Sequence, residues 1–180
     1  MRRALLAAAL LLVGVAASAQ EGDKPSAPSP SVSRRAEREA RFRSELTELI
    51  RSRTFRFMPV TMQNISLGTT RYIFAYYLYM DVEGSTARVH LPVEFTSFVI
   101  TTTNFDSPVR GYVVDEVDDN WRISFSLINE GESWLVELFV AEATGQARLA
   151  IATKQGVMRY IGSLSPLGGA SAAQRSWGIF

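Results

Sequence analysis

Residues 121–162 read WRISFSLINEGESWLVELFVAEATGQARLAIATKQGVMRYIG, and this stretch decides the fold. Apolar side chains fall on every second position of its runs, and turn residues separate the runs. A period of two is typical of β-strands, because successive side chains point to opposite faces of a sheet. The stretch therefore predicts three or four antiparallel strands with one buried face. The alternating residues are Trp121, Ile123, Phe125 and Leu127, then Trp134, Val136, Leu138 and Val140, then Ala147, Leu149 and Ile151.

The composition limits the classes of function. The chain has 180 residues, a formal charge of +1, no cysteine and one histidine, His90. A near-neutral charge gives no electrostatic footprint for nucleic acid. The absence of cysteine excludes disulfides, thiolate metal ligands and cysteine nucleophiles, and a single histidine excludes paired-histidine chemistry. We therefore expect no nucleic-acid partner, no metal and no cofactor.

Residues 1–19 have the layout of a secretory signal peptide. Arg2 and Arg3 form a positive start, residues 4–16 are an apolar run, and residues 17–19 (Ala-Ser-Ala) form a cleavage site. The apolar run is shorter than the ~18 residues of a membrane span. We expect Sec-type export to the periplasm or the cell exterior, with no stable membrane span after cleavage. Without cysteine there is no lipid anchor, so the mature chain is expected to be soluble.

The rest of the chain divides by composition. Residues 20–33 are rich in proline and serine and predict a flexible linker, because they bury too little apolar surface to offset the cost of ordering. Residues 34–164 predict a single domain made of a helix and antiparallel strands. Residues 165–180 are rich in glycine, serine and alanine and predict a flexible tail.

The domain begins with a helical pattern. Ser33 is a plausible N-cap, and the following residues are rich in arginine and glutamate. Phe42, Leu46, Leu49 and Ile50 have the spacing i, i+4, i+7 and i+8, which places them in one apolar stripe of a helix. We expect this stripe to pack on the sheet and the charged face to be solvated.

The segments before Trp121 add further strands. Residues 54–58 predict a strand that ends at Pro59, and residues 70–82 (TRYIFAYYLYMDV) predict a strand that is aromatic on both faces. A glycine-containing turn joins the latter to residues 86–92, which favours a hairpin. Residues 92–108 predict a strand flanked by loops, and 109–117 a further strand. The predicted class is mainly β (α+β): a curved antiparallel sheet or partly open barrel of about eight strands, with one N-terminal helix packed on it.

Five stretches resemble the bacterial domain-of-unknown-function family 4251, whose members are exported proteins. In order they are FRFMP (55–59), YLYMDVEGSTARVHLP (77–92), WRISFSL (121–127), WLVELFVAEATGQARLAIAT (134–153) and VMRYIG (157–162). The resemblance covers roughly residues 37–164. It implies an exported domain of one helix and antiparallel strands, and it carries over no catalytic residues.

The candidate catalytic and metal-binding residues lack the required patterns. His90 is next to Arg88 on the polar face of its strand, without a convergent partner in the sequence. The acidic cluster at residues 115–119 lacks the spacing of a calcium loop and coincides with a predicted turn. Glu130 and Glu132 flank a turn glycine, where carboxylates are solvated. The sequence therefore favours a protein that is not an enzyme.

The excess of aromatic residues is the one feature that indicates a binding site. Tyr72, Tyr77, Tyr79, Phe95 and Phe98 exceed what a one-sided sheet needs to bury, so we predict that they bind a ligand. The alternative is that both faces of the strand are core. We expect an exported binding protein for a small apolar ligand or an envelope partner. The alternatives are a periplasmic hydrolase that uses acidic residues and a structural component of an envelope complex.

Overall fold

The computed structural model describes residues 30–64, 68–73, 77–95 and 100–167. Within these ranges the chain forms one helix followed by strands. The elements are α1 (Pro30–Arg51), β1 (Thr54–Asn64), β2 (Thr69–Tyr72), β3 (Tyr79–Glu83), β4 (Thr86–Phe95), β5 (Ile100–Pro108), β6 (Arg110–Val117), β7 (Asn120–Asn129), β8 (Glu132–Ala141), β9 (Gln146–Thr153) and β10 (Gly156–Ser165).

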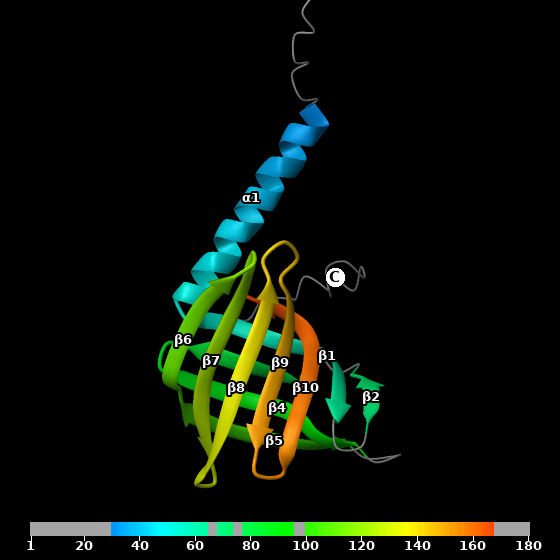
Figure 1. Cartoon of the computed structure of the whole chain (residues 1–180), viewed down its shortest axis with the longest axis vertical. Coiled ribbons are helices and arrows are strands. Elements are labelled where there is room, and N and C mark those ends of the chain that lie inside the picture. The colour runs from blue at the N-terminus through cyan, green and yellow to red at the C-terminus, as the bar shows by residue number, and fades with distance from the viewer. Residues whose placement is uncertain (1–29, 65–67, 74–76, 96–99, 168–180) are drawn as a thin grey trace, which may run out of the picture.

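The described strands form one ten-stranded antiparallel sheet that does not close. Their order is β5-β4-β3-β1-β10-β9-β8-β7-β6, with β2 paired to the end of β1. The sheet folds over itself, so that β6 to β10 form one layer that crosses in front of β1, β3, β4 and β5 (Figure 1). The predicted class is confirmed: a mainly β domain with a curved, open antiparallel sheet and one N-terminal helix.

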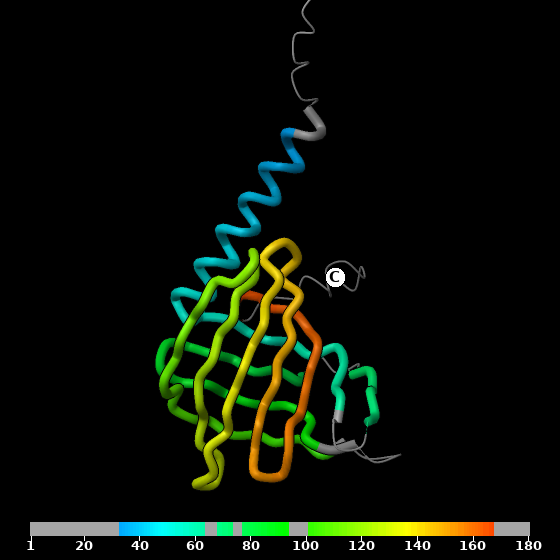
Figure 2. The backbone as a smooth tube through the Cα atoms, viewed as in Figure 1, coloured from blue at the N-terminus to red at the C-terminus, as the bar shows by residue number. Residues whose placement is uncertain are grey.

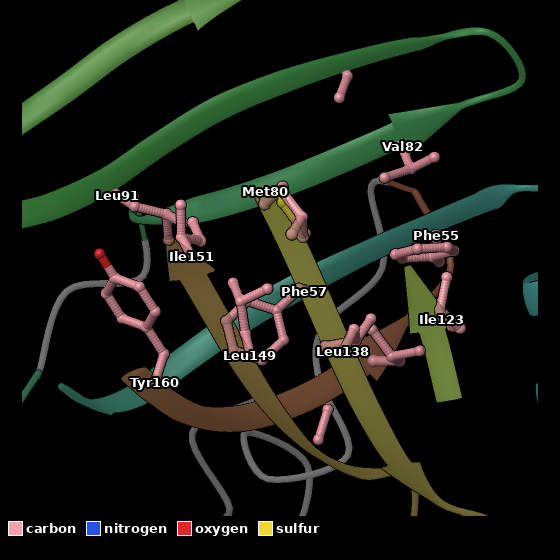
Figure 3. Close-up of a cluster of buried hydrophobic side chains, with 14 of the residues drawn as sticks. Phe55, Phe57, Met80, Val82, Leu91, Ile123, Leu138, Leu149, Ile151 and Tyr160 are labelled. Carbon is pink, nitrogen blue, oxygen red and sulfur yellow. The ribbon is translucent and has the colours of Figure 1, made fainter. Parts of the chain in front are cut away.

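The core lies between the two layers of the folded sheet (Figure 3). All the alternating residues named above for the stretch from Trp121 to Ile151 are buried, which confirms the period of two. From the other layer, Phe57 of β1 lies opposite Met80 of β3, and both are fully buried. Burial of apolar surface stabilises the fold by ~25 cal/mol per Å² removed from water. This shared core is what holds the two layers together.

The contact between β1 and β10 is where the two layers join. The strand predicted to end at Pro59 continues to Asn64, because the pairing with β10 shifts register between Pro59 and Thr61. Such an irregularity accommodates a residue that has no N–H to donate. Opposite it, Gly162 of β10 lies so close that a Cβ would overlap the carbonyl oxygen of Met58.

The aromatic stretch 70–82 is divided rather than continuous. Its first part forms β2 and its last part forms β3, and each pairs with a different portion of β1. In β3 the predicted alternation holds, since Met80 and Val82 are buried while Tyr79 faces the other way. The segment predicted as one two-faced strand therefore supplies two short strands to the same sheet.

Residues 92–95 and 100–108 belong to two paired strands instead of one strand flanked by loops. β4 continues through Pro92 to Phe95 and pairs with β5, with a register shift between Pro92 and Glu94. The shift again lies beside a proline, which cannot complete the hydrogen-bond ladder.

Helix α1 is attached to the sheet by its C-terminal turns, while its N-terminal half extends away from the body (Figure 2). It begins at Pro30, a few residues before the predicted N-cap at Ser33. Leu46 and Ile50 of the predicted stripe are buried, and Phe42 and Leu49 pack against the core in part. The Tyr112 hydroxyl of β6 donates to the Ile50 carbonyl at 2.9 Å, which satisfies a carbonyl of the last helical turn.

Candidate functional site

Two of the predicted ligand-binding tyrosines gather around His90. Tyr79 lies opposite His90 in the β3–β4 pairing, and their rings stack with centroids 6.1 Å apart. Tyr77 contacts the same imidazole edge-on at 6.0 Å. All three are on the outer face of the layer, away from the core, and Tyr77 is 51% exposed. The structure thus forms an outer-face aromatic cluster of Tyr77, Tyr79 and His90.

A row of alternating charges adjoins this cluster. Arg56, Asp81, Arg88 and Asp106 lie directly opposite one another across β1, β3, β4 and β5. Arg56 donates to both carboxylate oxygens of Asp81, at 2.6 and 2.7 Å, and its guanidinium lies 4.3 Å from the Tyr79 ring centroid. The hydrogen bond from Arg56 to Asp81 raises the pKa of Arg56. These charges satisfy each other, so the row stabilises the sheet rather than offering a free charge.

The other predicted ligand residues lie elsewhere or cannot be placed. Tyr72 is 70% exposed on β2, which pairs with a different part of β1 from β3. Phe95 pairs through its backbone with Ile100 at the end of the β4–β5 hairpin. Phe98 falls outside the described residues. The structure brings together Tyr77 and Tyr79, and a role in ligand binding for these five residues stays a prediction.

A cleft of about 840 Å³ opens at the end of the sheet opposite α1. It lies between the β4–β5 hairpin and the β7–β8 and β9–β10 turns, which are at the bottom of Figure 1. We call it the open-end cleft. Its lining contains both polar and apolar side chains. The polar residues are Thr101, Thr102, Thr103, Asn104, Asn129, Glu130, Glu132, Thr153 and Gln155, and the large apolar ones are Val93, Trp134, Val157 and Met158.

Trp134 is the most distinctive residue of the cleft. It is 7% exposed and packs edge-on against Phe105 with ring centroids 5.1 Å apart. Its indole Nε1 is buried and makes no hydrogen bond within the described part of the chain. An unsatisfied buried donor costs about 1–3 kcal/mol.

Two further side chains fix the shape of the cleft. The Tyr160 hydroxyl donates to the Pro92 carbonyl at 2.6 Å, which ties β10 to β4 beside the lining residue Val93. Burial raises the pKa of Tyr160, so this hydroxyl keeps its proton far above neutral pH. The Glu132 carboxylate accepts the Lys154 backbone N–H at 2.5 Å and so joins the β7–β8 and β9–β10 turns.

Both carboxylates of the β7–β8 turn line the cleft. Glu130 and Gly131 have positive φ angles of 51° and 82°, which make a tight hairpin turn. This turn directs Glu130 and Glu132 toward the same opening, although one oxygen of Glu132 is held by Lys154. Both carboxylates therefore line one cleft, which is the arrangement that the hydrolase alternative requires.

The residues that the structure describes contain neither a cluster of metal-binding side chains nor a membrane-spanning helix. No group of three or more histidine, aspartate or glutamate side chains there is arranged to hold a metal ion. The acidic residues Asp118 and Asp119, considered above for calcium, form the two-residue turn between β6 and β7. The described part of the chain also has no helix of the length and apolarity needed to cross a membrane.

The sequence and the fold are both similar to those of a known protein family. The family model "Domain of unknown function (DUF4251)" matches residues 37–164. The crystal structure of a DUF4251 family protein from Bacteroides eggerthii DSM 20697 is similar, with a TM-score of 0.62 and 18% sequence identity. The alignment covers 74% of this chain and 93% of that one. No curated protein matches the chain.

Proposed function

The chain belongs to the DUF4251 family, and on this premise we propose that it is a non-catalytic binding protein of the bacterial envelope. The location follows the predicted signal peptide at residues 1–19. The observation that carries the binding role is the open-end cleft, whose lining joins Trp134 and other apolar side chains with threonine and asparagine side chains. Its volume is within the range of small-molecule sites, about 300–1,000 Å³.

The lining specifies the kind of ligand. The ring of Trp134 and the side chains of Val93 and Met158 offer apolar contact, while threonine and asparagine side chains offer hydrogen bonds. Glu130 and Glu132 add negative charge at the opening and disfavour an anionic ligand. A neutral or cationic amphipathic molecule fits this surface better than the purely apolar ligand expected from the aromatic residues alone.

The two buried tryptophans make the proposal testable by a matched pair of substitutions. Trp134→Phe keeps an aromatic ring and removes the indole of the cleft lining. Trp121→Phe makes the same change at a second indole whose Nε1 is also buried without a partner in the described residues, but in the core and not in the cleft lining. Both variants lose a buried tryptophan, so any general effect on packing is shared.

The experiment is a fluorescence titration with octyl glucoside, a neutral amphiphile, below its micelle concentration. We expect saturable binding to the unmodified chain and to the Trp121→Phe variant, with Trp134 as the reporter. Trp134→Phe removes this reporter and is followed by calorimetry, as is Thr102→Trp, which fills the cleft. Both should weaken binding, the second at least ~10-fold. An absence of saturable binding in the unmodified chain, or equal losses in the two tryptophan variants, would contradict the proposal.

A hydrolase is the second candidate, and Glu130 and Glu132 in one cleft favour it. In this role one carboxyl would donate a proton to a leaving group and the other would act as base. The test is the release of reducing ends from envelope glycan by the purified chain. Glu130→Gln and Glu132→Gln should each abolish the release, whereas Glu142→Gln, a change outside the cleft lining, should not. Unchanged release in the first two variants excludes this chemistry.

A further inference from the structure

A groove of about 480 Å³ lies between the C-terminal half of α1 and the end of β10, and we call it the α1–β10 groove. Its apolar wall includes Phe42 and Leu49 of the helix and Leu164 and Pro166 at the end of the sheet. It is separate from the open-end cleft, which is at the opposite end of the molecule (Figure 1). The groove leaves the apolar stripe of α1 only partly covered by described residues, since Phe42 and Leu49 are partly buried.

The chain leaves the described structure at the edge of this groove. Pro166 is a lining residue and Leu167 is the last residue described, so residues 168–180 are attached directly beside it. Gly168 and Gly169 come next and permit an immediate reversal of the chain. At ~3.3 Å per residue, the following residues can reach every part of the groove. A segment tethered this closely has an effective concentration in the millimolar range.

The sequence of this segment matches the groove in polarity and in charge. Residues 168–180 read GGASAAQRSWGIF, with Trp177, Ile179 and Phe180 as large apolar side chains and Arg175 as the one charged side chain. The groove carries Glu45 and Glu48 at its rim. Glu45 already pairs with Arg41 at 2.8 Å, whereas Glu48 forms no ion pair with another described residue.

We propose that residues 168–180 fold back and dock in the α1–β10 groove of the same chain. Trp177 and its apolar neighbours cover Phe42 and Leu49, and Arg175 faces Glu48. Composition alone predicts a flexible tail here, but a mobile tail would leave the apolar wall of the groove exposed to water. The docked segment joins α1 to the end of β10 and fixes the direction in which the helix leaves the body.

The experiment uses the chain labelled with 5-fluorotryptophan and observed by fluorine NMR. The three tryptophans give three signals, and Trp177→Phe identifies the one from the tail. For a docked tail we expect the Trp177 signal to show a smaller H₂O/D₂O isotope shift than free fluorotryptophan. Leu49→Asp in the groove should raise that shift to the free value. Leu135→Asp, on the far face of β8 where the residue is 61% exposed, should leave it unchanged.

The signals of Trp121 and Trp134 report in the same spectra whether each variant is folded. A charge exchange provides a second test: Glu48→Arg and Arg175→Glu should each increase the isotope shift, and the double variant should restore the smaller value. A Trp177 signal with the full isotope shift in the unmodified chain would overturn the proposal. A small shift that appears only with dimer formation in sedimentation would also overturn it, since the tail would then occupy a second copy.

Discussion

At Gly162 the absence of a side chain sets the distance between β1 and β10. A Cβ there would overlap the Met58 carbonyl oxygen, and this backbone atom cannot move without disturbing the pairing of the two strands. The φ angle of Gly162 is not among the positive ones, so the requirement is for space and not for an unusual backbone conformation. Gly162 is needed because it has no side chain, whereas the neighbouring Ser163 has a hydroxyl that is buried without a partner in the described residues.

We predict that Gly162→Ala lowers the free energy of unfolding by about 3 kcal/mol or more, because the added methyl group overpacks the contact between β1 and β10. Ser163→Ala, one residue away, should change it by less than ~1 kcal/mol or stabilise the fold, because it removes an unsatisfied polar group. Urea denaturation of both variants measures the difference. Similar free energies of unfolding for the two variants would contradict the claim that Gly162 is needed for the close contact of β1 with β10.

The charged row on the outer face contains one strong pair and one weak pair. The side chains of Arg56 and Asp81 are 24% and 12% exposed, whereas those of Arg88 and Asp106 are 59% and 71% exposed. We expect Asp81→Asn to cost about 1–3 kcal/mol, because it leaves a largely buried guanidinium without its counter-charge. Asp106→Asn should cost less than ~1 kcal/mol. Denaturation of the two variants at low and high salt measures both losses in the free energy of unfolding. Equal losses would show that the difference in burial does not set the strength of the two pairs.

At the scale of elements, α1 combines an anchored half with a projecting half. The side chains from Arg34 to Arg41 are exposed, while Leu46 and Ile50 are buried in the core. Phe42 lies at the boundary, where a Cβ on Gly145 of the β8–β9 turn would come within 2.9 Å of its ring. The last turns of the helix therefore belong to the core. Among the described residues, the ion pairs of the projecting half lie within the helix itself, as between Arg35 and Glu39.

We predict that removal of the residues before Arg41 changes the free energy of unfolding by less than ~1 kcal/mol, since the side chains from Arg34 to Ala40 are exposed. Ile50→Ala should cost about 2–5 kcal/mol, as expected for a large-to-small change in a core. Thermal and urea denaturation of the shortened chain and of the point variant measure both effects. A large loss on shortening would show that the projecting half contributes to the fold.

For the whole molecule, two tyrosine hydroxyls connect elements that are distant in sequence. Tyr112 joins β6 to the end of α1, and Tyr160 joins β10 to β4. Burial raises the pKa of Tyr112 to about 12 and also raises the pKa of Tyr160. The folded chain therefore retains protons that the unfolded chain releases near its ordinary tyrosine pKa of ~10.

We predict that the free energy of unfolding contributed by these groups is fully present below pH ~10 and falls as the pH rises toward 12. The free energy of unfolding falls with pH by at most ~1.4 kcal/mol per pH unit for each tyrosine, and we call this rate the slope. Tyr112→Phe should reduce the slope and cost about 1 kcal/mol at pH 7 through the lost hydrogen bond. Urea denaturation between pH 7 and 11.5 measures it, and an unchanged slope in the variant would exclude Tyr112 as a source.

Much of the fold was predictable because the information is local. The alternation from Trp121 to Ile151 identifies the buried face of each strand, since the pleat repeats every two residues. The stripe of Phe42, Leu46, Leu49 and Ile50 likewise marks the face of α1 that contacts the core. The points where strands begin and end were less predictable. The stretch 70–82 has one continuous aromatic pattern, yet the structure divides it between β2 and β3.

The open-end cleft was not predictable, because its residues share no local pattern. Val93, the threonines from 101 to 103, the β7–β8 turn and the β9–β10 turn meet only after the sheet has folded over. One signal was present: alternate turns of an antiparallel meander lie at the same edge, which places Glu130 near Gln155. The excess of aromatic residues instead predicted a ligand-binding site that includes Tyr77 and Tyr79, which the structure places around His90 on the outer face.

The sequence by itself determined the class of the fold, the buried face of each strand and the helix stripe, because each depends on a period that neighbouring residues carry. The tertiary structure alone decided which layer faces which, where the sheet stays open and which polar residues converge there. These depend on the register shift and the close contact of Gly162 with Met58 where β1 pairs with β10, and on packing between distant strands. A period in the sequence specifies a face of a strand, but it does not specify what that face will meet.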